Sequence, residues 1–274
     1  MRRRVSIVSS HDEVKTHKLG VGFRYSPYGM DFDPGPSYWA GVGREMTMRF
    51  PGAITEVIWI VSVVEGSGTR LTFPGVSTEP GSTFSKADTN QPALDLFDEL
   101  GYRVWLQVEP GDANVEALCD LILTRYGDSH PCLAGMGVDV EWHHSSDKPE
   151  GVSVSDEEAA SWLSVVRAHG EKYQLFLKHW KVSMLPPGLR DGILFVDDSQ
   201  MFDSLDAMRA EFEVWGKHFY PAPVAFQIGY PADKKWWGTM SDPAKEIGMS
   251  IIHSIPNTKG IYWVNFSALE VFPP

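Results

Sequence analysis

The sequence has little cysteine and little positive charge. It contains two cysteines, Cys119 and Cys132, among 274 residues. That is too few for a disulfide framework, and no C-x-x-C spacing indicates zinc, so we expect two buried thiols, with a Cys119–Cys132 pair as the alternative. Lys and Arg number 24 against 36 Asp and Glu, and the only basic cluster is the RRR at 2–4. A net charge of −12 argues against attraction to phosphate backbones, so we expect no nucleic-acid partner.

Long apolar runs are also missing. No stretch approaches the ~20 consecutive apolar residues of a membrane span, and the residues after MRRR lack the apolar core of a signal peptide. We therefore expect a soluble protein without a membrane span. The compartment stays open, because a secreted protein given without its export signal has the same composition. The sequence does not define the oligomeric state either.

Short apolar segments, in contrast, recur eight times, and most are followed by a stretch with helical spacing and capping residues. Strands that alternate with helices form parallel sheets, and eight strands close a barrel. We therefore predict an α/β fold, a single (β/α)8 TIM barrel, as one domain over residues 1–274. The expected strands are 19–26, 55–66, 102–111, 133–142, 173–180, 192–200, 223–230 and 260–267, and the expected helices are 90–101, 112–127, 153–170, 203–219 and 241–255.

Other segments carry weaker patterns. Proline and glycine in 27–54 and 181–191 leave room for only a short helix. Residues 65–89 read as a long loop in which GTRLTFPG (68–75) forms a hairpin. GVGFRY lacks the G-x-G-x-x-G spacing of a dinucleotide fold, so we expect no cofactor.

Nearly every expected strand turns polar at its carboxyl end, where the active sites of TIM barrels lie. In GMGVDVEWHH (135–144), Val138 and Val140 alternate with Asp139 and Glu141, so both acids are expected to face the barrel axis. On the preceding strand the same alternation places Trp105, Gln107 and Glu109 inside, and Val104, Leu106 and Val108 outside.

Two carboxylates two residues apart on a strand lie ~6–7 Å apart, which raises the proton affinity of one of them. We assign Glu141, the acid nearer the strand end, as the proton donor, with Asp139 orienting it or stabilising positive charge. Asp198, after the sixth strand, or Glu109 supplies a second carboxylate across the barrel. Two alternatives remain: both acids form salt bridges with Lys178 or Arg24, or they bind a metal together with His143, His144 and His179.

Ten tryptophans provide flat rings that suit sugar stacking as well as core packing. The candidates for stacking are Trp142, Trp180, Trp236, Trp237 and Trp263. The candidate polar binding groups at the strand ends are Glu109, Lys178, Gln227, Tyr230 and Asn265.

GMGVDVEW resembles the fourth-strand signature of the glycoside hydrolase barrels. It is similar to the D-G-x-D-x-D-x-E motif of family 18 chitinases and to the apolar run ending in D-x-E of family 25 lysozymes. Asp139 and Glu141 match D-x-E, whereas the chitinase alignment puts His143 at the position of the catalytic Glu. AFQIGY (225–230) and IYWVNF (261–266) are similar to late strands of family 25, but its first-strand aspartate has no counterpart, the nearest acids being Asp31 and Asp33.

The resemblance implies a distant relative of the TIM-barrel glycoside hydrolases, which cleaves glycosidic bonds in a polysaccharide or glycan by carboxylate acid/base catalysis without a metal. Its partner would be a carbohydrate substrate. Two alternatives stay open: a non-catalytic carbohydrate-binding barrel, and a metal-dependent hydrolase.

Overall fold

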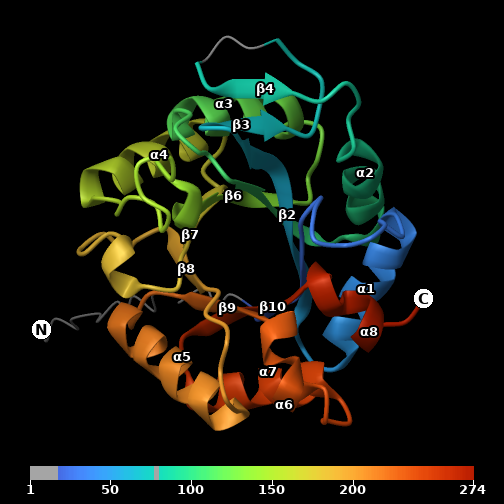
Figure 1. The fold of residues 1–274 in the computed structure, drawn as a ribbon. Helices are drawn as coiled ribbons and strands as arrows, with labels where there is room; N and C mark the ends of the chain where they lie inside the picture. The colour runs from blue at the N-terminus through green and yellow to red at the C-terminus, as the bar shows by residue number, and fades with distance from the viewer. Residues whose placement is uncertain (1–17, 77–79) are drawn as a thin grey trace, which may run out of the picture.

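The eight predicted strands form a closed parallel barrel in the computed structural model, which describes residues 18–76 and 80–274. Each strand pairs in parallel with its neighbours, and β1 closes the barrel by pairing with both β2 and β10. The prediction of a (β/α)8 barrel is confirmed (Figure 1). The barrel strands are β1 (Gly20–Tyr25), β2 (Ile54–Glu65), β5 (Arg103–Val108), β6 (Leu133–Asp139), β7 (Gln174–Lys178), β8 (Ile193–Asp197), β9 (Val224–Ile228) and β10 (Thr258–Val264).

Helices surround the barrel and cover its outer face (Figure 1). Ser155 caps α4 through a complete capping box with Glu158, and Asn114 caps α3 by accepting from Ala117 N. Asn90 does not cap α2 with its side chain; Asp88 Oδ1 accepts from the backbone N–H groups of Asn90 and Gln91 instead. The helices are α1 (Pro36–Met48), α2 (Gln91–Leu100), α3 (Val115–Tyr126), α4 (Asp156–Ala168), α5 (Leu205–Phe219), α6 (Lys234–Trp237), α7 (Pro243–Ser254) and α8 (Ala268–Val271).

Two of the segments with weak patterns differ from the prediction. Residues 36–48 form a helix of 13 residues, which starts at Pro36 and buries Trp39, Val42 and Met46 against the barrel. The loop predicted over 65–89 contains β3 (Gly68–Leu71) and β4 (Ser82–Phe84). β3 pairs antiparallel with the extended end of β2, and β4 adds to β3 in parallel, so the sheet continues beyond the barrel wall.

The core is divided by strand parity. Val104, Leu106 and Val108 pack outward against the helices, while Trp105 faces the interior with Phe176, as predicted for β5. The chain also contains two buried free thiols, Cys119 and Cys132, which do not pair. No helix in the described ranges is long and apolar enough to cross a membrane.

Candidate functional site

The carboxyl ends of the strands gather around the ammonium group of Lys178, the last residue of β7. Its Nζ lies 2.8 Å from Asp139 Oδ2, 2.5 Å from Asp198 Oδ2 and 3.6 Å from Glu141 Oε2. Lys178 is 2% exposed. Burial alone would lower the pKa of Lys178, but the carboxylates of Asp139, Asp198 and Glu141 raise it well above its usual value. Asp139 and Glu141, at the end of β6, and Asp198, directly after β8, therefore share one buried cation.

Glu141 is the member of this cluster that reaches solvent, with 27% of its side chain exposed. β6 ends at Asp139, and Val140–Trp142 form a turn of 3-10 helix, so the strand predicted to reach residue 142 is three residues too long. The turn still brings Glu141 to Lys178. Burial raises the pKa of Glu141 to about 7, and the neighbouring carboxylates of Asp139 and Asp198 add to that rise against the attraction of Lys178.

Asp139 and Asp198 differ in how their oxygens are used. Asp139 is completely buried; both its oxygens accept from Lys178, and Oδ2 also accepts from Gln107 Nε2 at 3.1 Å. Asp198 Oδ2 contacts Lys178, whereas its buried Oδ1 has no hydrogen-bond partner among the described residues. Asp197 belongs to the outer face of β8, where its Oδ1 accepts from Ser199 N. Asp198 is thus the acid of this pair that faces the cluster.

A second buried ion pair lies beside the first. Glu109 Oε1 is 3.8 Å from Arg24 Nη2 and accepts a hydrogen bond from Tyr28, whose ring lies on the loop after β1. Burial raises the pKa of Glu109 to about 7, with the Asp139 carboxylate contributing and Arg24 opposing. The sequence predicts Arg24 only as an ion-pair partner of the acids, and it gives no indication of the role of Tyr28. The alternation of Gly20, Gly22 and Arg24 on the inner face of β1 is the signal that points to Arg24.

Several buried polar atoms at this end of the barrel have no partner in the described residues. They are Arg24 Nε, Ser62 Oγ, Gln107 Oε1, Asp197 Oδ2, Asp198 Oδ1 and Gln227 Nε2. Gln227 is fully buried, and its Oε1 accepts from Tyr230 at 2.9 Å. Because an unpaired buried polar atom costs about 1–3 kcal/mol, several of them at one end of the barrel indicate a surface built to hydrogen-bond a polar ligand.

The predicted stacking tryptophans divide into two groups. Trp142 and Trp180 are half-buried on the loops after β6 and β7, and Trp180 stacks on His179 with 4.2 Å between ring centroids. Trp263 and Trp237 lie in the core between barrel and helices, where they contact each other edge to face. Trp263 faces outward because Tyr262 takes the inner position on β10, so its ring offers no face to a sugar, contrary to expectation. Trp236 is partly buried and donates to Phe202 O.

Asn265 has a structural contact in place of the expected free amide. Its side chain accepts from Ser26 N and Oγ and donates to Ser26 O and Tyr28 O, which fixes the loop after β1 to the end of β10. It therefore positions Tyr28, the residue that covers Glu109.

The histidines named for a metal site are engaged elsewhere. His179 uses both ring nitrogens, on Glu150 O and Lys181 N, and His143 Nδ1 contacts Val152 O. His144 is 3.7 Å from Asp112 on the surface. Within residues 18–76 and 80–274, no group of three or more His, Cys, Asp or Glu side chains is arranged to hold a metal ion.

Comparison with known proteins identifies the fold. No protein-family model and no curated protein sequence matches this chain. The structure is similar to that of a putative alpha-L-fucosidase from Bacteroides thetaiotaomicron VPI-5482, with a TM-score of 0.57, 12% sequence identity, and coverage of 96% of this chain and 91% of that chain. A GH5-4 broad specificity endoglucanase from an uncultured bacterium gives a TM-score of 0.49 at 10% identity, over 90% of this chain and 87% of that chain. The similarity to the first of these structures, together with the closed eight-stranded barrel, shows that the chain has a TIM-barrel fold.

Proposed function

We propose that this protein is a glycoside hydrolase in which Glu141 is the general acid and Asp198 the second carboxylate. The observation that carries the proposal is the arrangement of Glu141, Asp139 and Asp198 around Lys178 at the carboxyl ends of the strands. Cleavage of a glycosidic bond requires one carboxylic acid to protonate the leaving oxygen and one carboxylate to act at the anomeric carbon.

Glu141 suits the acid role. A pKa of about 7 keeps a substantial fraction of its carboxyl groups protonated near neutral pH, and its partial exposure lets it reach a leaving group. The distance to Lys178 separates the acid role of Glu141 from the carboxylate role of Asp198. Lys178 Nζ lies 2.5 Å from Asp198, where its charge favours the ionised form, but 3.6 Å from Glu141.

Asp198 suits the nucleophile role. Lys178 holds Oδ2, and the buried Oδ1 has no hydrogen-bond partner in the described residues, so the carboxylate is anchored through one oxygen while the other is not committed to a protein group. The Glu141 and Asp198 oxygens that face Lys178 lie no further apart than the sum of their two distances to Nζ, about 6 Å, which is compatible with the ~5–5.5 Å between the carboxyl groups of retaining enzymes. The proposed outcome is retention of configuration.

Asp139 and Lys178 position the reacting groups. Asp139 has its oxygens occupied by Lys178 and Gln107, so it holds the ammonium group in place between Glu141 and Asp198. Tyr230 lies close enough for Lys178 to lower its pKa, although burial raises it overall. Gln227, Glu109, Tyr230 and the Arg24 guanidinium then offer hydrogen bonds to sugar hydroxyls, and Trp142 and Trp180 offer rings for stacking.

The test is release of reducing ends from a panel of purified polysaccharides and aryl glycosides, with wild type and Glu141→Gln side by side. We expect turnover by the wild type and a loss of about 100-fold or more in the variant, because Gln cannot donate the proton. Glu150→Gln is the matched control, since Glu150 pairs with Lys181 on the surface, outside the cluster. Equal turnover by wild type and Glu141→Gln would contradict the assignment.

A non-catalytic carbohydrate-binding barrel is the second candidate. The observation in its favour is that Asp139, Asp198 and Lys178 are at most 5% exposed and largely neutralise one another. It predicts glycan binding, measurable by calorimetry, that Glu141→Gln leaves unchanged, with no turnover of any substrate by the wild type.

A further inference from the structure

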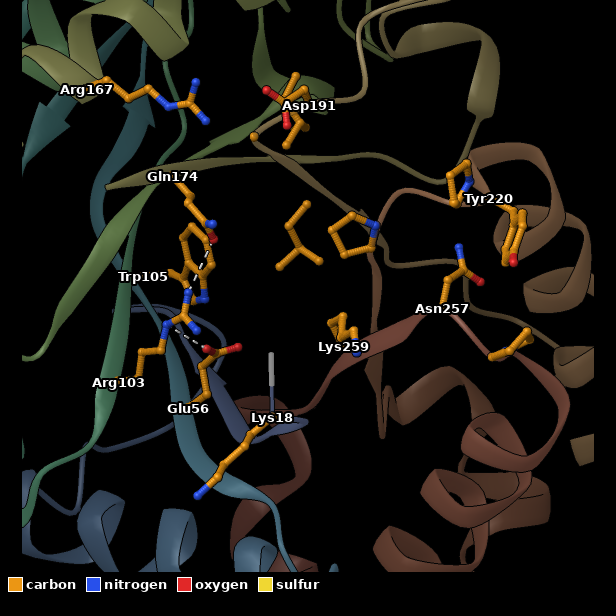
Figure 2. Close-up of a pocket in the computed structure, with 16 residues that line it drawn as sticks. Lys18, Glu56, Arg103, Trp105, Arg167, Gln174, Asp191, Tyr220, Asn257 and Lys259 are labelled. Atoms are coloured by element: carbon orange, nitrogen blue, oxygen red, sulfur yellow. Dashed lines mark hydrogen bonds and ion pairs between the residues drawn. The ribbon is translucent and has the colours of Figure 1, made fainter. Parts of the chain in front are cut away.

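A cavity of about 450 Å³, shown in Figure 2, is lined by residues at the amino-terminal ends of the barrel strands. The candidate active site lies at the opposite, carboxyl ends. Its walls come from the starts of barrel strands, among them Glu56 of β2, Arg103 of β5 and Gln174 of β7. The volume falls within the ~300–1,000 Å³ of small-molecule sites. Catalysis at the other end of the barrel makes no use of these residues.

The lining is cationic in a chain that is strongly acidic. The whole sequence carries a net charge of −12, yet the charged residues around this cavity are four cations and two acids. A local reversal of charge favours an anionic ligand and raises its concentration at the opening. The cations are Lys18, Arg103, Arg167 and Lys259, and the acids are Glu56 and Asp191.

Arg103 is held in a fixed orientation at this site. Its Nε is 3.1 Å from Glu56 Oε2, its Nη2 donates to Gln174 Oε1 at 3.3 Å, and its guanidinium carbon lies 5.3 Å from the Trp105 ring centroid. Glu56 is itself buried and accepts from Tyr262 at 2.5 Å. A guanidinium held by its neighbours loses little entropy when it binds a carboxylate or a phosphate.

Arg167 supplies a second guanidinium. It lies in the last turn of α4 and is exposed, and it forms no ion pair with any residue in 18–76 or 80–274. Its side chain crosses Gly192, where a Cβ atom would be 2.3 Å from Arg167 Nη2. Figure 2 shows it extending from α4 toward the cavity.

The remaining wall is apolar. It is formed around the starts of β8, β9 and β10 by Ile193, Leu194, Tyr220, Pro221, Pro223 and Pro256. Such a wall stabilises a ring or a hydrocarbon body by removing apolar surface from water. The cavity thus joins two guanidinium groups to an apolar surface within one small volume.

We propose that this cavity binds a small organic anion whose carboxylate or phosphate group pairs with Arg103 and Arg167 and whose ring or hydrocarbon body packs on the proline-rich wall. The ligand class follows from the two guanidinium groups, which form charge-assisted hydrogen bonds with carboxylates and with phosphates. A neutral sugar would form no ion pair with Arg103 or Arg167.

Isothermal titration calorimetry with benzoate and with phenyl phosphate tests the proposal, and the two probes separate the carboxylate from the phosphate as the recognised group. We expect at least one probe to bind the wild type, and Arg167→Gln to weaken it by about tenfold, the loss of one charge-assisted contact. Arg103→Lys keeps the positive charge beside Glu56 but removes the planar guanidinium with its several N–H donors. We expect this variant to bind the probe about as weakly as Arg167→Gln does.

Arg209→Gln is the control, because Arg209 forms its ion pairs on the exposed face of α5. The proposal is overturned if neither probe binds at millimolar concentration, if benzyl alcohol binds as well as the anions, or if Arg167→Gln and Arg209→Gln have the same effect. Circular dichroism of each variant verifies that it is folded. Each of these outcomes leaves glycan cleavage at the opposite end of the barrel untouched.

Discussion

Lys178 shows how one side chain sets the properties of its neighbours. Its charge opposes the effect of burial on Glu141 and Asp139, and their carboxylates in turn raise its own pKa. A buried ion pair is costly to form, and removal of one partner leaves an uncompensated charge. We therefore propose that the cluster serves positioning and chemistry more than stability.

The raised pKa of Glu141 predicts a pH dependence of stability. With a pKa of about 7 folded and about 4.5 unfolded, Glu141 binds more protons in the folded state, so its stabilising contribution is full below pH ~4.5 and is lost as the pH rises through 7. Glu141→Gln removes this loss and should raise the free energy of unfolding at pH 8, relative to wild type, by about 1–2 kcal/mol, with no such gain at pH 4.5. Urea unfolding at both pH values measures it.

The control for that experiment is Glu150→Gln. Lys181 lowers the pKa of Glu150, so the sign is opposite, and this variant should show no gain at pH 8. A gain for Glu150→Gln equal to that for Glu141→Gln would contradict the burial of Glu141 as the cause.

Among the elements, the strands were predicted best. Period-2 alternation placed Trp105, Gln107 and Asp139 inside the barrel, because each strand alternates between an apolar helix-facing side and the axis. Ends of strands were less predictable: β6 stops at Asp139 because Val140–Trp142 turn into a 3-10 helix, which the sequence pattern does not distinguish from strand. Trp263 was misplaced because its face depends on the register of β10.

Gly137 of β6 shows how closely the strands pack beneath the cluster. A Cβ atom at this position would be 1.9 Å from the Phe176 ring, which lies on the inner face of β7 two residues before Lys178. Gly137→Ala should lower the free energy of unfolding by about 1–3 kcal/mol through overpacking. Gly41→Ala is the matched control: Gly41 lies inside α1 with nothing near the added Cβ, so the change should stabilise by up to about 1 kcal/mol. Equal effects in urea unfolding would contradict the packing argument.

At the scale of the whole molecule, the barrel separates two polar ends by an apolar middle of Ile58, Trp105, Phe176, Val196 and Tyr262. The carboxyl end could be anticipated from sequence, because its acids follow apolar strands. The cavity at the other end could not, because its residues come from many separate segments and no motif joins them. The sequence does indicate Lys178 as an ion-pair partner of Asp139 and Glu141, but not its contact with Asp198, which is set by barrel closure.

Stereochemistry decides whether Glu141 and Asp198 form a catalytic pair. Proton NMR of the first product released by the wild-type protein, recorded before mutarotation, reads the anomeric configuration directly. A nucleophilic Asp198 beside the acid Glu141, both in contact with Lys178, predicts the same anomer as in the substrate. An inverted anomer would contradict Asp198 as the nucleophile, and an absence of product from every glycoside would contradict hydrolysis itself.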